Sequence, residues 1–148
     1  MRLTERTDYA LRVLMFLAAS ERQATVAEMA ERFGVSHHHL VKVVQMLGEI
    51  ELITTTRGRG GGVILSVDPE SVYIGDVVEH IEPDLALVEC MRSDGACPLS
   101  GPCRLQGLLD DARAAFLETL NDSTLADLAA PKRTLLRVLG VQASRRTG

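Results

Sequence analysis

The sequence contains no tryptophan, and aromatic residues make up only 3% of its 148 positions. The core is therefore expected to be aliphatic, and a broad aromatic platform for stacking nucleic-acid bases is not expected. Long apolar runs are also missing: the longest, Val13 to Ala19, spans seven residues, whereas a membrane-crossing helix needs about 20. Acidic residues precede this run where a secretion leader would be basic, so we expect a cytoplasmic protein with no membrane partner.

Charge is distributed unevenly along the chain. The formal net charge is −4, which for the chain as a whole argues against a nucleic-acid partner. Residues 1–66 carry 8 basic and 7 acidic side chains, residues 67–131 carry 3 and 13, and residues 132–148 carry 5 basic and no acidic ones. The acidic middle of the chain would repel a polyanion such as nucleic acid, so we expect the N-terminal part to bind it. A hydrophobic content of 46% and a charged content of 24% exclude general disorder.

The first half of the chain has the pattern of a helix-turn-helix followed by a hairpin. A largely buried helix and two capped helices joined by a short turn are predicted over residues 5–20, 25–34 and 36–49. Two β-branched segments, 52–56 and 63–67, flank a glycine-rich tip and predict a β-hairpin. A hairpin directly after a helix-turn-helix indicates a winged helix.

The second half predicts a connecting helix over residues 74–81, a loop that contains every cysteine, and a long helix over 103–120. One apolar stripe runs along the long helix and consists of Leu105, Leu108, Leu109, Ala112, Phe116 and Leu120. The three N-terminal helices already supply a core, so we expect this stripe to pack on a second copy of the chain. Short helices after Thr124 and Lys132 and a basic tail after Gly140 are predicted to complete the chain.

The predicted fold class is mainly α with a small β-hairpin wing. We expect a winged helix-turn-helix DNA-binding domain over residues 1–70, a connecting helix and cysteine loop over 71–103, and a dimerisation helix with a C-terminal tail over 104–148. The two-fold symmetry of a homodimer implies an inverted-repeat operator, with half-sites about one or two helical turns apart. No nucleophile–base pair, phosphate loop or pair of catalytic carboxylates is recognisable, so an enzyme is not expected.

Candidate DNA-binding residues fall in two places. Glycines at the wing tip let the backbone approach DNA closely, and the arginines there can enter a minor groove or contact phosphates. The alternative is that the tip is only a flexible hairpin turn. The helix over 36–49 has a polar start, which suits an N-terminal end that meets DNA, and solvated surface is the alternative. Its three consecutive histidines cannot converge on one metal ion, because neighbouring helical residues point about 100° apart. The candidates are Ser36, His37, His38, His39 and Lys42 on the helix and Arg57, Arg59 and Gly60 on the wing.

Three cysteines, Cys90, Cys97 and Cys103, lie within 14 residues of loop-like sequence. An odd number in a chain expected to be cytosolic argues against a disulfide framework. Their spacing lacks the close pairs of a zinc knuckle and suits thiolates that bind different irons of an iron–sulfur cluster, which would need a fourth ligand. From spacing alone a cluster is favoured, while zinc, a thiol redox switch and inert cysteines stay open.

Short motifs along the chain gain meaning from their order. They are Leu3-Thr4, Thr7-Asp-Tyr-Ala-Leu-Arg-Val-Leu14, Ser36, His39-Leu-Val-Lys-Val43, Arg57-Gly-Arg-Gly-Gly-Gly62, Ile74-Gly-Asp-Val-Val78, Leu87-Val-Glu-Cys90, Cys97-Pro-Leu, Cys103-Arg-Leu and Thr124-Leu-Ala-Asp-Leu128. In this order they resemble the iron–sulfur winged-helix transcriptional repressor family of the NsrR/IscR type, over nearly the whole chain.

The resemblance implies a homodimeric repressor of operator DNA whose iron–sulfur cluster, [4Fe-4S] rather than [2Fe-2S], responds to nitric oxide. Cys90, Cys97 and Cys103 of one subunit would hold the cluster, and Asp8 of the partner subunit would complete it, as in the nitric-oxide-sensing branch. The cluster-biogenesis branch carries a histidine three residues after the last cysteine, where this chain has Gln106. The alternative is a winged-helix regulator that senses cluster status, or senses oxidants through its thiols or a zinc site.

Overall fold

The structure is a computed structural model that describes residues 2–141. Its elements are α1 (Glu5–Ser20), α2 (Val26–Phe33), α3 (His37–Glu49), β1 (Ile53–Thr56), β2 (Gly62–Leu65), η1 (Pro69–Ser71), α4 (Ile74–Ile81), η2 (Glu89–Met91), α5 (Arg104–Asn121), α6 (Leu125–Ala129) and α7 (Lys132–Val138). The predicted fold class, mainly α with a two-stranded antiparallel hairpin, is confirmed. Most of the predicted basic tail lies in residues 142–148, outside the described residues. Between residues 2 and 141 no helix is long and apolar enough to cross a membrane.

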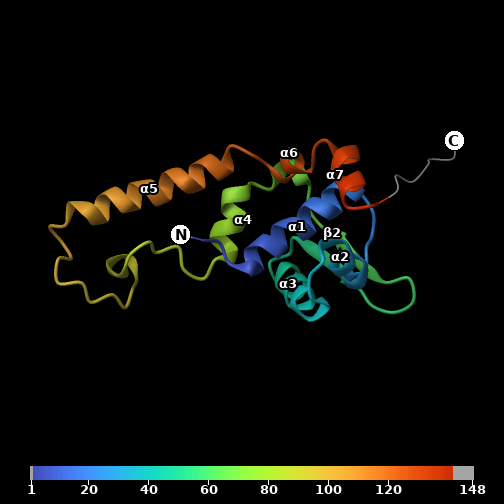
Figure 1. The fold of residues 1–148 in the computed structure, drawn as a ribbon, viewed down its shortest axis with the longest axis horizontal. Coiled ribbons are helices and arrows are strands. Elements are labelled where there is room, and N and C mark those ends of the chain that lie inside the picture. The colour runs from blue at the N-terminus through green and yellow to red at the C-terminus, as the bar shows by residue number, and fades with distance from the viewer. Residues whose placement is uncertain (1, 142–148) are drawn as a thin grey trace.

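Helix α1 is the buried centre of the molecule (Figure 1). The hydroxyl of Thr4 caps it by accepting a hydrogen bond from the backbone N–H of Thr7 at 3.4 Å. Leu14 and Phe16 are fully buried, and Phe16 is the one aromatic residue in the buried core of the described chain. Helix α3 packs against one side of α1, and α6 and α7 pack against the other (Figure 1). The predicted aliphatic core and buried first helix are thus confirmed.

Helices α2 and α3 form the predicted helix-turn-helix. Thr25 caps α2 by accepting a hydrogen bond from the backbone N–H of Glu28 at 3.0 Å, and Gly34 ends it with a left-handed φ of +64°. Thr25 and Glu28 form only half of a capping box, because the Glu28 carboxylate accepts hydrogen bonds from Arg22 instead. These hydrogen bonds lower the pKa of Glu28. Ser36 occupies the predicted N-cap position of α3, but its hydroxyl makes no capping hydrogen bond.

Strands β1 and β2 form the predicted wing, with Thr56 opposite Gly62 at the tip end. Ile53 and Val63 point into the body and are buried. Ala24, in the connection between α1 and α2, pairs with Val63 through two backbone hydrogen bonds of 2.7 and 3.0 Å. This single-residue bridge ties the wing to the helix-turn-helix.

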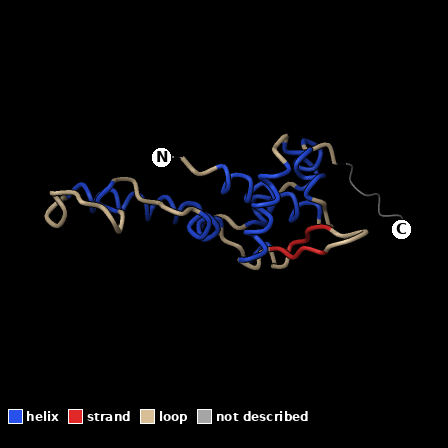
Figure 2. The backbone as a smooth tube through the Cα atoms, turned by 90° about the horizontal axis from the view of Figure 1, so that it is seen from below, coloured by secondary structure: helices blue, strands red, loops and turns tan. Residues whose placement is uncertain are grey.

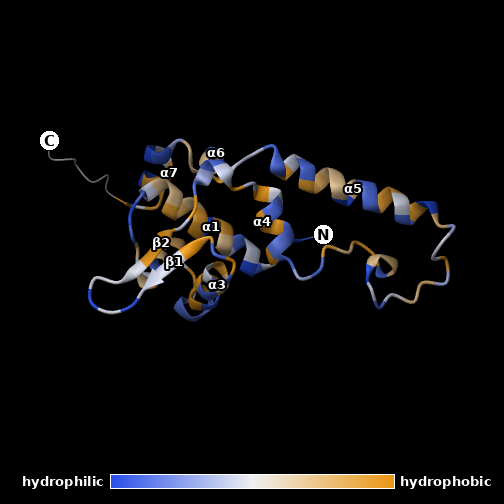
Figure 3. Cartoon of the chain, turned by 180° about the vertical axis from the view of Figure 1, so that it is seen from behind, coloured by the Kyte–Doolittle hydropathy of each residue, from blue (hydrophilic) through white to orange (hydrophobic). Residues whose placement is uncertain are grey.

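Helix α5 projects from the body, as two perpendicular views show (Figures 1 and 2). None of its residues is buried, and Leu105 and Leu108 are 57% and 65% exposed. Apolar patches alternate with polar ones along it (Figure 3). The cysteine segment contacts α5 through η2, the one helical turn that residues 84–102 contain. The outer part of the predicted stripe is therefore uncovered within the described chain.

After α5 the chain returns to the body, where α6 and α7 pack against α1. Leu125 is fully buried there. Thr124 and Asp127 form a complete capping box at the start of α6, and hydrogen bonds from the backbone and hydroxyl of Thr124 lower the pKa of Asp127. Arg32 of α2 donates a hydrogen bond of 3.0 Å to the carbonyl of Leu139 at the end of α7. These helices, grouped by sequence with the dimerisation helix, complete the core of the winged helix.

We predict that Leu125→Ala destabilises the winged-helix domain, because it leaves a cavity in the core around α1. The free energy of unfolding should fall by about 2–5 kcal/mol, measured by urea denaturation. Val138→Ala on α7 is the matched control: this side chain is 78% exposed, and its loss should change the free energy by less than about 0.5 kcal/mol. Equal losses in the two variants would show that α6 is not part of the core.

Candidate functional site

The first two turns of α3 gather the DNA-binding candidates that the sequence places on this helix. Leu40 and Val43 are buried on the inner face of α3. The polar candidates Ser36, His37, His38, His39 and Lys42 are all exposed. Since the apolar face is held by the body and the polar N-terminal end faces solvent, α3 has the arrangement of a recognition helix that enters a major groove.

The wing tip exposes its three candidates, Arg57, Arg59 and Gly60. Gly58 and Gly60 have φ values of +95° and +76°, which other residues rarely adopt, so the path of the tip depends on glycine. The side-chain amide of Gln23 donates a hydrogen bond of 2.6 Å to the carbonyl of Gly60 and braces the tip. Sequence reasoning missed Gln23, because 37 residues separate the pair and no local pattern connects them.

The start of α1 adjoins the recognition helix. A hollow of about 180 Å³ lies between the two helices, and its lining residues are Glu5, Arg6, Tyr9, His39, Lys42 and Val43. The same end of α1 is tied to the end of α4. The Glu82 carboxylate accepts hydrogen bonds from the Thr4 backbone N–H and hydroxyl at 2.8 and 3.1 Å, and Arg6 donates one of 2.9 Å to the Ile81 carbonyl. The cysteine segment follows Glu82 in the chain. Its first residues are therefore attached to the same end of α1 that borders the recognition helix.

The three cysteine thiols are free and half-buried. Desolvation raises the pKa of the Cys90 thiol, and the neighbouring Cys97 and Cys103 raise it further. Arg92 lies between two acidic residues of the same segment, with its Nε 3.5 Å from Asp84 and 3.4 Å from Asp94. Ion pairs within the segment therefore link its beginning to its middle.

The donor set of this segment, three cysteine thiols, is of the kind that iron–sulfur clusters use. Across residues 2–141 no three His, Cys, Asp or Glu side chains are gathered so that they could hold one ion. A [4Fe-4S] cluster binds each thiolate to a different iron, so its cysteines sit farther apart than the ligands of one zinc. Three soft sulfur donors within 14 residues of one loop match the ligand type that such a cluster uses.

Asp8 lies on α1 in the body, whereas the cysteines lie on the projecting part (Figure 1). Its carboxylate accepts two hydrogen bonds from the guanidinium of Arg12, at 3.0 Å from Nε and 2.6 Å from Nη2. The two side chains are 48% and 44% exposed. The structure thus does not bring Asp8 to the cysteines of its own chain, and it leaves the carboxylate partly open to a second molecule.

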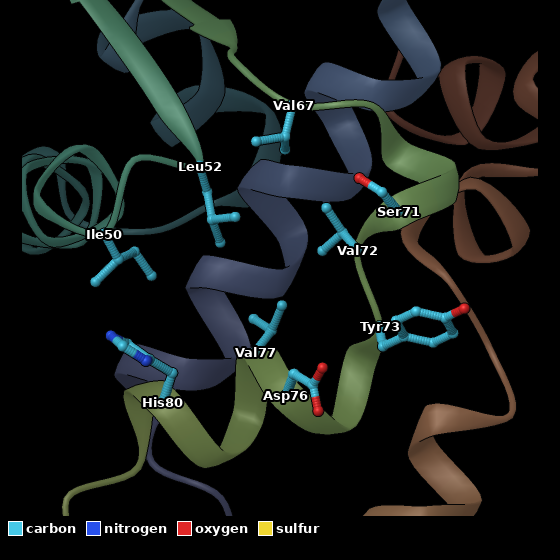
Figure 4. Close-up of a pocket in the computed structure, with 9 residues that line it drawn as sticks. All are labelled: Ile50, Leu52, Val67, Ser71, Val72, Tyr73, Asp76, Val77 and His80. Atoms are coloured by element: carbon cyan, nitrogen blue, oxygen red, sulfur yellow. The ribbon is translucent and has the colours of Figure 1, made fainter.

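A further hollow, of about 290 Å³, lies between α4 and the connection from α3 to β1 (Figure 4). Its inner wall is aliphatic and is formed by Ile50, Leu52, Val67, Val72 and Val77. Tyr73, Asp76 and His80 on and beside α4 stand around it (Figure 4). Asp76 is already bonded to Asn121 of α5, so this hollow offers no free carboxylate for chemistry.

A helix-turn-helix, an exposed polar recognition helix and a wing tipped with two arginines define a winged-helix DNA-binding regulator. The chain belongs to the Rrf2 family of iron-dependent transcriptional regulators, whose sequence profile matches residues 3–131. It is therefore a transcriptional regulator and not an enzyme.

Relatives and solved structures agree with this assignment. The chain is 41% identical over 142 residues to the HTH-type transcriptional regulator NsrR of Bacillus subtilis (strain 168), which covers 94% of this chain and 97% of that protein. It is 44% identical over 142 residues, with the same coverage, to the regulator of that name from Geobacillus kaustophilus (strain HTA426). It also resembles the structure of CymR (YrzC), the global cysteine regulator of B. subtilis, with a TM-score of 0.72 and 26% identity over 88% of this chain and 97% of CymR.

We predict that Arg59→Ala weakens DNA binding, because the wing tip loses a cation that meets phosphate. The slope of log affinity against log salt concentration should become shallower by about one unit, measured by fluorescence anisotropy. The matched control is Arg133→Ala on α7, which removes an exposed charge on the side of α1 away from α3 and should leave the slope unchanged. If Arg57→Ala, Arg59→Ala and the double variant all keep wild-type affinity, the wing is not part of the interface.

Proposed function

We propose that this regulator is a homodimeric iron–sulfur repressor that binds an inverted-repeat operator and releases it in response to nitric oxide. The observation that carries the proposal is the set of three free cysteines within 14 residues, on the projecting part of a DNA-binding protein. The family description and the NsrR-named relatives support it. Anaerobic purification, followed by a visible spectrum and an iron and sulfide count, tests it directly. A colourless protein that contains zinc, or no metal, contradicts it.

The homodimer is proposed from the uncovered apolar stripe of α5. Leu105 and Leu108 are more than half exposed, and the stripe continues toward the body as one face of a long helix. Exposed apolar stripes of this length are typical of protein–protein contacts. Pairing of α5 with a second copy covers the stripe and places two recognition helices in a two-fold arrangement, which reads an inverted repeat.

The cysteines have the role of holding the cluster. Cys90, Cys97 and Cys103 supply three thiolates, and [4Fe-4S] is favoured over [2Fe-2S]. When bound, the cluster supplies irons with which nitric oxide reacts.

Asp8 of the partner subunit is the proposed fourth ligand. In the described chain its carboxylate is paired with Arg12, and an exposed pair of this kind contributes no more than about 1 kcal/mol. The carboxylate can therefore leave Arg12 at low cost. Because Asp8 lies on the first turns of α1, beside the hollow that borders α3, gain or loss of this ligand acts next to the recognition helix.

Replacing Cys90, Cys97 or Cys103 by serine is expected to abolish the visible absorption and to weaken specific operator binding. Dimerisation should persist, since the stripe on α5 lies outside the cysteine loop. Spectroscopy, fluorescence anisotropy and analytical ultracentrifugation measure the three properties. Full operator affinity in all three colourless variants would exclude the cluster as the switch.

Asp8→Ala is expected to leave a cluster that still forms on three thiolates, but with an altered spectrum, faster initial reaction with nitric oxide and lower DNA affinity. Stopped-flow absorption measures the reaction. Glu5→Ala, which removes the other acidic residue of the first turn of α1, is the matched control. A wild-type spectrum and wild-type kinetics in Asp8→Ala exclude Asp8 as the ligand, and a changed spectrum in Glu5→Ala would move the assignment to Glu5.

A further inference from the structure

Helix α5 is attached to the body at a joint formed by Gly75 of α4 and the last turns of α5. The carboxamide of Asn121 accepts a hydrogen bond of 3.0 Å from the backbone N–H of Asp76 and donates one of 2.9 Å to the Asp76 carboxylate. A Cβ on Gly75 would lie 2.5 Å from the Oδ1 of Asn121 and closer still to the carbonyl oxygen of Leu117. Because both obstacles belong to α5, the absence of a side chain at Gly75 sets how closely the two helices approach.

Backbone hydrogen bonds between the chain segments that flank the two helices fix the joint. The segment before α4 pairs with the segment after α5: the Leu125 N–H donates to the Val72 carbonyl at 2.8 Å, and the Ile74 N–H donates to the Ser123 carbonyl at 3.2 Å. Ile74 and Gly75 are buried, so α4 is fixed in the body at this point. The end of α5 therefore has little freedom to slide or rotate.

The rest of α5 amplifies any change at the joint. Leu117 is partly buried against the body, whereas the outer half of the helix has no buried residue. From Leu117 to Arg104 the helix extends about 20 Å, so a tilt of about 10° at the joint moves the outer end by about 3–4 Å. That displacement is comparable to the rise of one base pair, about 3.4 Å.

We propose that the joint of Gly75 and Asn121 sets the direction of α5 and, through it, the spacing between the two half-sites that the dimer reads. Gly75 and Asn121 are positioning residues that contact neither DNA nor the cysteines. The inference rests on the proposed homodimer, because only a pair of recognition helices has a spacing to set.

The test uses Gly75→Ala, with Gly48→Ala on α3 as the matched control, since a Cβ at Gly48 meets no atom within 4 Å. Half-sites selected from random DNA with the wild-type protein are placed in inverted repeats whose spacers differ by single base pairs. For Gly75→Ala we expect at least tenfold weaker binding at the wild-type spacing, a displaced optimum, and affinity for a single half-site within twofold of wild type. Asn121→Ala removes the two hydrogen bonds without adding a clash, so we expect a flattened preference, with neighbouring spacings within threefold of each other.

Solution X-ray scattering of each variant gives a second readout that needs no DNA. The overall dimensions should change in Gly75→Ala and not in Gly48→Ala. Wild-type spacing preference and wild-type scattering in both Gly75→Ala and Asn121→Ala overturn the proposal. If the wild-type protein selects no inverted repeat, the proposed dimeric repressor is contradicted, and so is the role of the joint in half-site spacing. In that case the scattering of the variants alone decides whether the joint sets the direction of α5.

Discussion

Apolar burial around α1 is the interaction on which the rest of the molecule depends. Helices α3, α6 and α7 and the wing strand β2 all pack against this one helix, and a fully buried side chain such as Leu14 or Phe16 contributes about 1.5–3 kcal/mol to stability. The recognition helix and the C-terminal helices thus share one support. A shift of α1 cannot be confined to one of them, because a close-packed core transmits displacement.

Polar contacts place the remaining parts on this support. Thr4 and Arg6 tie the start of α1 to Glu82 and Ile81 at the end of α4, where the cysteine segment begins, and Gly75 anchors α5 at the other end of α4. Helix α4 therefore connects three functional parts: the DNA-binding surface, the cysteines and the long helix with the uncovered stripe. In the proposed function this connection gives events at the cysteines a short physical route to the recognition helix.

The sequence predicted the elements well where local chemistry specifies them. Thr25 and Gly34 mark the bounds of α2 because capping and a left-handed turn act within a few residues, and the glycine-rich tip between β-branched segments predicts the wing for the same reason. The candidate DNA-binding residues are all exposed, as expected from the polar start of α3. Their contacts with DNA, the cluster ligands and the role of Asp8 stay predictions.

Other features were beyond reach of the sequence because they join residues far apart in the chain. Helices α6 and α7 belong to the core around α1, Gln23 braces the wing across 37 residues, and Asn121 binds Asp76 across 45. Periodicity shows that a helix has an apolar face, but it does not show what covers that face. Local residue preferences thus account for the helices, the turns and the grouping of the cysteines, whereas long-range packing selects which faces are buried, where α5 departs and which part of the protein supports the recognition helix.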